Sequence, residues 1–167
     1  MTTSSDAAGR PAGEERTQAV VGVGSMVMGD DGVGYHAIEA LEDRSLPDGT
    51  SLTHAGTTAF LALEAMSGAD RALVVDALAL DEPPGTIREF RLDRPEVDAP
   101  EVTMHDYSFT DALAVGDVAY DVPERVRLLG VVPAELDPAL ELSDPVSAAL
   151  PELVSRIEQR LTEEAQD

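Results

Sequence analysis

Residues that could bind a metal ion or move a proton follow short apolar runs at three places in the chain. Asp30 and Asp31 lie in the glycine-rich stretch VGVGSMVMGDDGVG, residues 21–34. Asp76 ends the apolar run RALVVD, and His105 follows an acidic segment that contains prolines. Carboxylates and imidazoles can hold a divalent cation or transfer protons during hydrolysis. These positions predict a site if the fold brings them together.

Each of these residues also has an ordinary structural explanation. An aspartate at a helix start is a common cap that stabilises by about 1 kcal/mol, so one of Asp30 and Asp31 could be purely structural. Asp76 could close a turn at a strand end, and His105 could be a hydrogen-bonded loop histidine. Taken singly, each type of residue is more often structural than functional. The residues alone do not decide which of the two would satisfy the helix start and which would face the site.

The glycine-rich stretch does not fit a nucleotide-binding loop. A dinucleotide fingerprint needs a third glycine where this chain has Val27, and an acid where its second predicted strand ends on His54. A phosphate loop needs a lysine, and the chain has none. Two adjacent carboxylates at a helix start would also repel phosphate. The pattern favours a metal or substrate site over a phosphate cradle.

Composition narrows the classes of partner. The 167 residues include no cysteine, so thiolate metal sites, iron–sulfur clusters and a cysteine nucleophile are excluded. All 11 basic residues are arginine against 33 acids, which gives a net charge of −22. Such a charge opposes binding to nucleic acid or an anionic membrane. Cations and basic protein segments are the expected partners; the oligomeric state cannot be predicted.

The acidity is typical of cytosolic proteins from salt-accumulating organisms. We therefore expect a halophilic source, in which case the helical signal falls on dialysis from molar to low salt. The N-terminus lacks the pattern of a secretion signal, and no apolar run approaches membrane-spanning length. A cytoplasmic location is expected.

Apolar periodicity predicts a single α/β domain over residues 17–167, preceded by a disordered extension over residues 1–16. Most predicted strands are apolar on both faces and alternate with helices. This favours the α/β class, with three layers and a mostly parallel twisted sheet of about five strands that has helices on both faces. We expect strands at 17–23, 50–54, 71–75, 86–92 (an edge strand) and 126–132, and helices at 33–41, 58–66, 108–115 and 143–163, the last kinked or restarted at Pro151.

Functional groups in parallel sheets gather at the carboxyl ends of strands, which is where the aspartates lie. There the stretch GVGSMVMGDDGVG, residues 22–34, resembles the N-terminal signature of the hydrogenase maturation proteases. These are the endopeptidases that trim the large subunit of nickel–iron hydrogenases. The likeness covers about residues 19–162. Further matching motifs follow in the family's order: GT at 56–57, VVDA at 74–77, PGT at 84–86, TMH at 103–105 and GVVP at 130–133.

The resemblance implies a function and a set of site residues. It implies an endopeptidase that removes a C-terminal peptide from a nickel-loaded hydrogenase large-subunit precursor. Asp31, Asp76 and His105 then become the metal-binding and catalytic residues, of an aspartic or metal-associated type, and Asp30 is left to satisfy the helix start. Nickel would be the substrate's own ion, for which other divalent cations can substitute, and no resident cofactor is implied.

Three departures from the family pattern concern the substrate more than the fold. Ser25 stands where the family usually has asparagine, His54 stands where an acid is frequent, and Asp106 adds a charge beside His105. Two other functions stay open: a non-catalytic metal- or partner-binding chaperone module, and a peptidase with another protein substrate. The chemical step also stays open between a metal-bound water and a carboxylate acting as general base.

Overall fold

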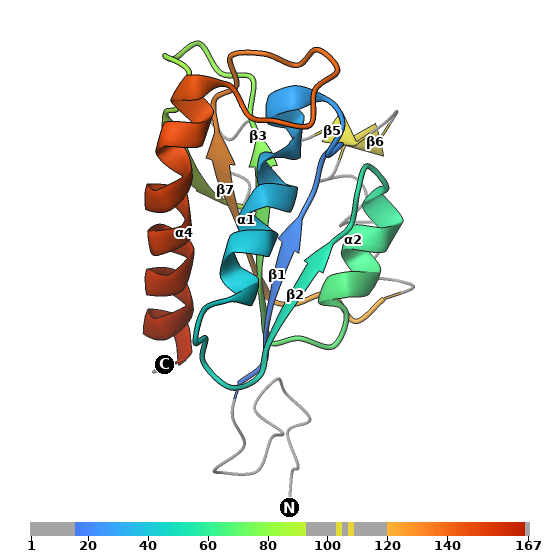
Figure 1. Ribbon diagram of the computed structural model, residues 1–167. Helices are drawn as coiled ribbons and strands as arrows, with labels where there is room; N and C mark the ends of the chain where they lie inside the picture. The colour runs from blue at the N-terminus through green and yellow to red at the C-terminus, as the bar shows by residue number, and fades with distance from the viewer. Residues whose placement is uncertain (1–15, 93–102, 105–106, 109–119, 166–167) are drawn as a thin grey trace, which may run out of the picture.

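The computed structural model describes residues 16–92, 103–104, 107–108 and 120–165 (Figure 1). Its main sheet has five strands in the order β2-β1-β3-β7-β4, and β5 pairs with β6 in a separate two-stranded sheet. The strands are β1 (Gln18–Gly22), β2 (Thr50–His54), β3 (Arg71–Ala77), β4 (Ile87–Arg91), β5 (Thr103–Met104), β6 (Tyr107–Ser108) and β7 (Arg125–Val131).

The main sheet is parallel except at one edge, as the sequence predicts. β1 pairs in parallel with β2 and β3, and β3 pairs in parallel with β7. β4 runs antiparallel to β7 and forms the predicted edge strand. The register aligns Gly22 with His54 and Val75, and Asp76 with Gly130. The carboxyl ends of four strands therefore lie together, with Asp76 among them.

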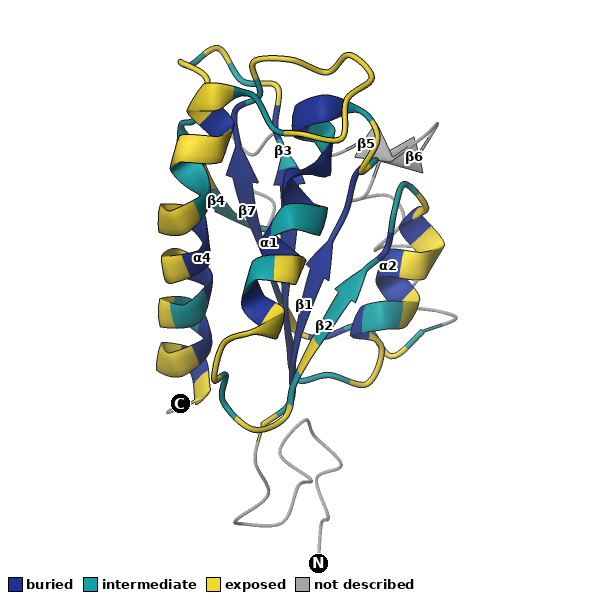
Figure 2. Ribbon diagram, in the orientation of Figure 1, coloured by how far each residue is buried: buried dark blue, intermediate teal, exposed yellow. Residues whose placement is uncertain are grey.

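Helices cover both faces of this sheet and give the three predicted layers. They are η1 (Gly29–Gly32, a 3-10 turn), α1 (Val33–Glu42), α2 (Ala59–Met66) and α4 (Asp144–Ala165). Buried side chains of α1 and α4 pack with Val20 and Leu73 on one face. Those of α2 pack with Val21 and Val74 on the other (Figure 2). Alternate strand residues therefore supply two separate cores.

Two glycines explain how closely α1 approaches the sheet. A Cβ atom on Gly34 would lie 2.6 Å from the carbonyl oxygen of Val75, and one on Gly22 would lie 2.5 Å from that of Gly34. Any side chain at either position would push the helix off the strands. The glycine-rich signature thus brings the start of α1 against the carboxyl ends of β1 and β3.

The structure decides two of the predictions made for helices. Of the kink and the restart predicted at Pro151, the restart is wrong, because α4 continues through Pro151 as one helix. Ser108, predicted to begin a helix, lies in the short strand β6; residues 109–115 of that helix lie outside the described residues, as do residues 1–15 of the predicted extension. Within the described part of the chain, no helix is both long and apolar enough to cross a membrane.

Candidate functional site

The first loop extends β1 beyond its last residue and then turns back sharply. The N–H of Val23 donates to the carbonyl of Val75 at 2.9 Å, and the N–H of Gly24 donates to that of Gly56 at 2.8 Å. Gly24 then has φ +108°, and a Cβ atom there would lie 2.1 Å from the carbonyl oxygen of Asp31. Only glycine fits this turn, because other residues would be strained and would clash.

The turn brings Asp31 back over the end of β1. Its Oδ2 accepts a 2.7 Å hydrogen bond from the N–H of Ser25, which closes the loop on itself. Asp31 is half-buried rather than fully covered. One carboxylate oxygen is therefore fixed by the loop, and the residue still reaches solvent.

Asp76 lies near the end of β3 and is only 7% exposed. Its Oδ1 accepts a 2.7 Å hydrogen bond from the N–H of Ala77. Burial, followed by the negative charge of Asp31, raises the pKa of Asp76 well above its ordinary value of 3.8. The hydrogen bond from Ala77 opposes that rise without cancelling it. Among the described residues, no arginine or histidine forms an ion pair with Asp76.

The geometry thus brings together two of the residues predicted from the sequence. Two carboxylates close enough to repel each other in a partly dehydrated place stabilise an incoming cation. Because its pKa is raised, Asp76 also accepts a proton more readily than an exposed aspartate does. Both kinds of chemistry belong to the site that the sequence predicts.

The third predicted residue, His105, lies outside the described residues, and so does Asp106. Within residues 16–92 and 120–165, no three side chains of the types that bind metals converge into a cluster that could hold an ion. The complete set of Asp31, Asp76 and His105 therefore stays a prediction.

Asp30 has a different role from the helix cap that the sequence suggests. Neither η1 nor α1 has a side-chain cap, and Asp30 is fully buried. Its carboxylate accepts hydrogen bonds of 2.7–2.9 Å from the N–H groups of Ala134, Glu135 and Ser143 and from the Ser143 hydroxyl. Burial alone would raise the pKa of Asp30, but these bonds outweigh it and lower the pKa. Asp30 ties the first loop to the segment between β7 and α4.

Sequence reasoning missed a group of aromatic and imidazole rings beside the first loop. Nε2 of His54 lies 3.1 Å from the carbonyl oxygen of Gly24, and its ring packs edge-on against Tyr35. Tyr35 also packs edge-on against His36, whose Nε2 lies 3.2 Å from the carbonyl oxygen of Leu140. His54 thus contacts the backbone of the turn that orients Asp31. Its position at the end of β2 was the one signal in the sequence for this.

Comparisons with known proteins agree with this architecture. The sequence model of the family described as "Hydrogenase maturation protease" (HycI) matches residues 35–160. The hydrogenase 2 maturation protease of Escherichia coli K12 is 28% identical over 147 residues, which cover 86% of this chain and 90% of that protein. The hydrogenase expression/formation protein HupM of Azotobacter chroococcum is 33% identical over 135 residues, or 78% of this chain. The matched part spans 65% of HupM's own length.

A solved structure extends the likeness to three dimensions. The hydrogenase maturating endopeptidase HybD of E. coli matches with a TM-score of 0.75 and 26% identity, over 89% of this chain and 93% of that one. The five-stranded, mostly parallel sheet with flanking helices is therefore shared with HybD.

Proposed function

The chain belongs to the hydrogenase maturation protease family, and from this premise we propose that it is an endopeptidase. Its substrate would be the nickel-loaded precursor of a nickel–iron hydrogenase large subunit, from which it removes a C-terminal peptide. The observation that carries the proposal is the pair formed by Asp31 and Asp76. Asp76 is buried beside a second carboxylate, and no described cation offsets the repulsion. An arrangement that destabilises the protein by itself suits a substrate that brings its own positive charge.

The nickel ion of the substrate would be that charge. Asp31, Asp76 and His105 offer two carboxylates and one imidazole, a donor set that suits nickel and leaves positions for groups of the substrate. Because the ion arrives with the precursor, recognition of nickel would restrict cleavage to loaded subunits. Other divalent cations with the same preferences can substitute for it in a binding measurement.

Asp76 is also suited to the chemical step. Its raised pKa makes its carboxylate a stronger proton acceptor than that of an exposed aspartate. We assign to it the removal of a proton from the water that attacks the scissile carbonyl. Asp31 and His105 would then hold the nickel-bearing end of the precursor in place, and Asp76 would share that task through one carboxylate oxygen while the other accepts the proton.

The test is to incubate the purified protein with a nickel-loaded precursor and to measure the precursor's mass. We expect the loss of a short C-terminal peptide. Asp76→Ala and His105→Ala should reduce kcat/KM by about a thousandfold or more with an unchanged circular dichroism spectrum. Full activity in either variant would refute the assigned residues.

Two outcomes would point to the other functions. A precursor that is bound but stays intact would favour a non-catalytic chaperone module. A source genome that encodes no nickel–iron hydrogenase large subunit with a C-terminal extension would remove the substrate and leave a peptidase acting on another protein.

A further inference from the structure

Large apolar side chains are exposed at only a few places on the described residues. They are Met26 (38% exposed), Val27 (50%), Phe60 (44%), Leu61 (51%), Leu136 (48%) and Leu140 (68%). Phe60 and Leu61 lie on α2, whereas the other four lie on two loops at the carboxyl edge of the sheet. Apolar groups gathered on a surface commonly mark a contact with another molecule.

Backbone hydrogen bonds join those two loops into one unit. Met28 and Ala139 form an isolated parallel β-bridge. The N–H of Gly29 donates to the carbonyl of Ala139, and the N–H of Ala139 donates to that of Val27, both at 3.0 Å. We call residues 25–29 and 133–143 together the double loop; it lies beside η1 in Figure 1 and is largely exposed in Figure 2.

Buried contacts hold the double loop in a fixed conformation. Asp30 accepts its four hydrogen bonds from Ala134, Glu135 and Ser143. Gly29 has φ +58°, and a Cβ atom there would lie 2.8 Å from the carbonyl oxygen of Glu135, so the two backbones are in close contact. Leu142 packs against the core under α1 and α4. A surface ordered in this way binds with a smaller entropic cost than a flexible loop.

The exposed leucines of the double loop stand among negatively charged side chains. In the segment PAELDPALELS, residues 133–143, Glu135, Asp137 and Glu141 are exposed and stand beside Leu136 and Leu140. The double loop has no basic residue, and the sequence has none between Arg127 and Arg156. A complementary partner would present apolar side chains together with arginine or lysine.

The double loop also adjoins the carboxylate pair. Asp31 directly follows Asp30, whose side chain holds the double loop in place. The N–H of Asp31 donates to the carbonyl of Met28. A peptide bound across the double loop would therefore continue toward Asp31 and Asp76. Leu61 lies on α2, which packs on the opposite face of the sheet from α1 and α4.

We propose that the double loop binds the C-terminal segment of the precursor, through apolar and basic side chains that lie beside the bond to be cut. This inference rests on the proposed function and adds the surface that selects the peptide. A second copy of the chain is disfavoured as the occupant because it carries the same charge of −22.

The test compares a double variant with a matched control on α2. Leu136→Ser with Leu140→Ser should raise KM for the precursor about tenfold or more, with kcat within about twofold, because the lost contacts serve binding only. Leu61→Ser removes a leucine about as exposed as Leu136, 51% against 48%, and should change neither constant. Glu135→Gln with Glu141→Gln should raise KM and weaken its dependence on salt.

Each result separates this inference from the proposed function. If the wild type cleaves the precursor and the leucine variant has an unchanged KM, the double loop is not the binding surface. The proposed function then still stands. If the wild type cleaves nothing, the affinity of the precursor is measured for the wild type and for the leucine variant. Equal affinities would overturn the inference. A dimer that the leucine variant converts to monomer in sedimentation would assign the surface to self-association and overturn it too. Leu140→Ser alone, at the more exposed position, replaces the double variant if the latter unfolds.

Discussion

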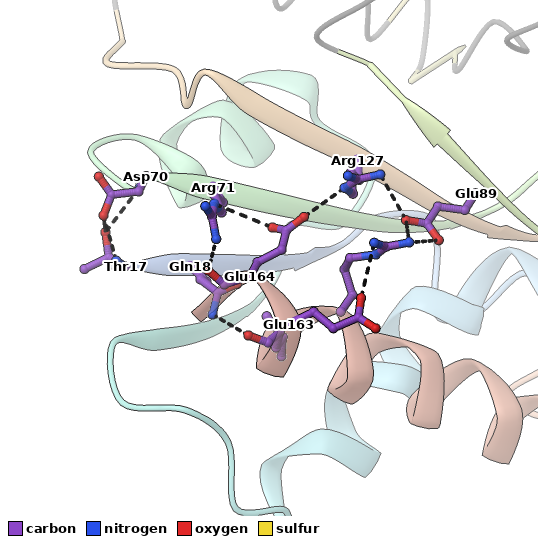
Figure 3. Close-up of polar contacts among 10 residues, drawn as sticks. Thr17, Gln18, Asp70, Arg71, Glu89, Arg127, Glu163 and Glu164 are labelled. Carbon is purple, nitrogen blue, oxygen red and sulfur yellow. Dashed lines mark hydrogen bonds and ion pairs between the residues drawn. The ribbon is translucent and has the colours of Figure 1, made fainter. Parts of the chain in front are cut away.

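The two ends of the parallel sheet bury acidic residues in opposite ways. At the amino end, Glu164 of α4 is 6% exposed and contacts two arginines (Figure 3). Its Oε1 lies 2.9 Å from Nε of Arg127, and its Oε2 lies 3.8 Å from Nε of Arg71. At the carboxyl end, Asp76 is as deeply buried, yet the charge that acts on it is the negative one of Asp31.

One strand carries both arrangements. β3 begins with Arg71 and carries Asp76 five residues later. The Arg71 guanidinium also donates to the backbone carbonyl of Glu164, so this end fastens α4 to the sheet. The ion pairs continue from Arg127 to Glu89 and on to Arg160. Matched charges at one end serve the fold, whereas the repelling charges lie at the end where we propose that the substrate binds.

Removing the matched acid should have the largest effect on stability. Glu164→Gln keeps the shape of the side chain but takes the negative charge away from two arginines. We expect the free energy of unfolding to fall by about 3 kcal/mol. Urea unfolding measures this, and cleavage of the precursor under conditions where the variant is folded should be unchanged. A stability equal to that of the wild type would break the comparison at this end.

Asp30 lies between these two cases. It is buried like Glu164 and Asp76, but backbone N–H groups and a hydroxyl, rather than arginines, stabilise its charge. In Asp30→Asn, one oxygen becomes an NH₂ group that faces donors from Ala134, Glu135 or Ser143. We expect a loss of about 1–3 kcal/mol in the free energy of unfolding. Because the same bonds hold the double loop, proteolysis within residues 133–143 should also become faster. Protection equal to that of the wild type would show that Asp30 does not order this segment.

The pH dependence of the free energy of unfolding should reveal the repulsion between Asp76 and Asp31. The pKa of Asp76 is raised in the folded state, so the folded protein holds this proton more tightly than the unfolded chain does. The stability that Asp76 contributes is therefore fully present below about pH 4 and is lost as the pH rises through the raised pKa. Asp76→Asn should remove this loss, so the difference in unfolding free energy between wild type and variant should grow with pH. A constant difference would contradict the raised pKa.

The smallest change in stability is expected from an exposed ion pair between an arginine and a glutamate. Arg156 and Glu152 lie 2.8 Å apart on the solvent-facing side of α4. Glu152→Gln should change the free energy of unfolding by less than about 0.5 kcal/mol, because water and salt screen the pair. A loss as large as that of Glu164→Gln would show that burial does not distinguish the two pairs.

The sequence predicted the five strands of the main sheet and the proximity of two aspartates because local patterns encode both. The buried run RALVV gave β3, and the close approach of α1 follows from Gly22 and Gly34. Asp31 and Asp76 were predicted to lie together because each follows a predicted strand, and the parallel register brings such strand ends together.

Long-range contacts account for what sequence reasoning missed. Nothing near Asp30 indicates that its partners are more than 100 residues away, so a local cap was the simplest prediction. The strand order places β7 between β3 and β4, and no periodicity encodes that choice. Pro151 left a kink and a restart open, and the buried residues Val146, Leu153 and Ile157 keep α4 one helix against the sheet.

The most direct test of the account compares activity and stability in Asp76→Asn. The amide keeps an oxygen for the hydrogen bond from Ala77 and removes the charge that Asp31 repels. At pH 7.5, we predict that the variant unfolds at a higher urea concentration than the wild type and no longer cleaves the nickel-loaded precursor. A variant that is less stable than the wild type, or that still cleaves the precursor, would contradict the claim that this end of the sheet trades stability for function.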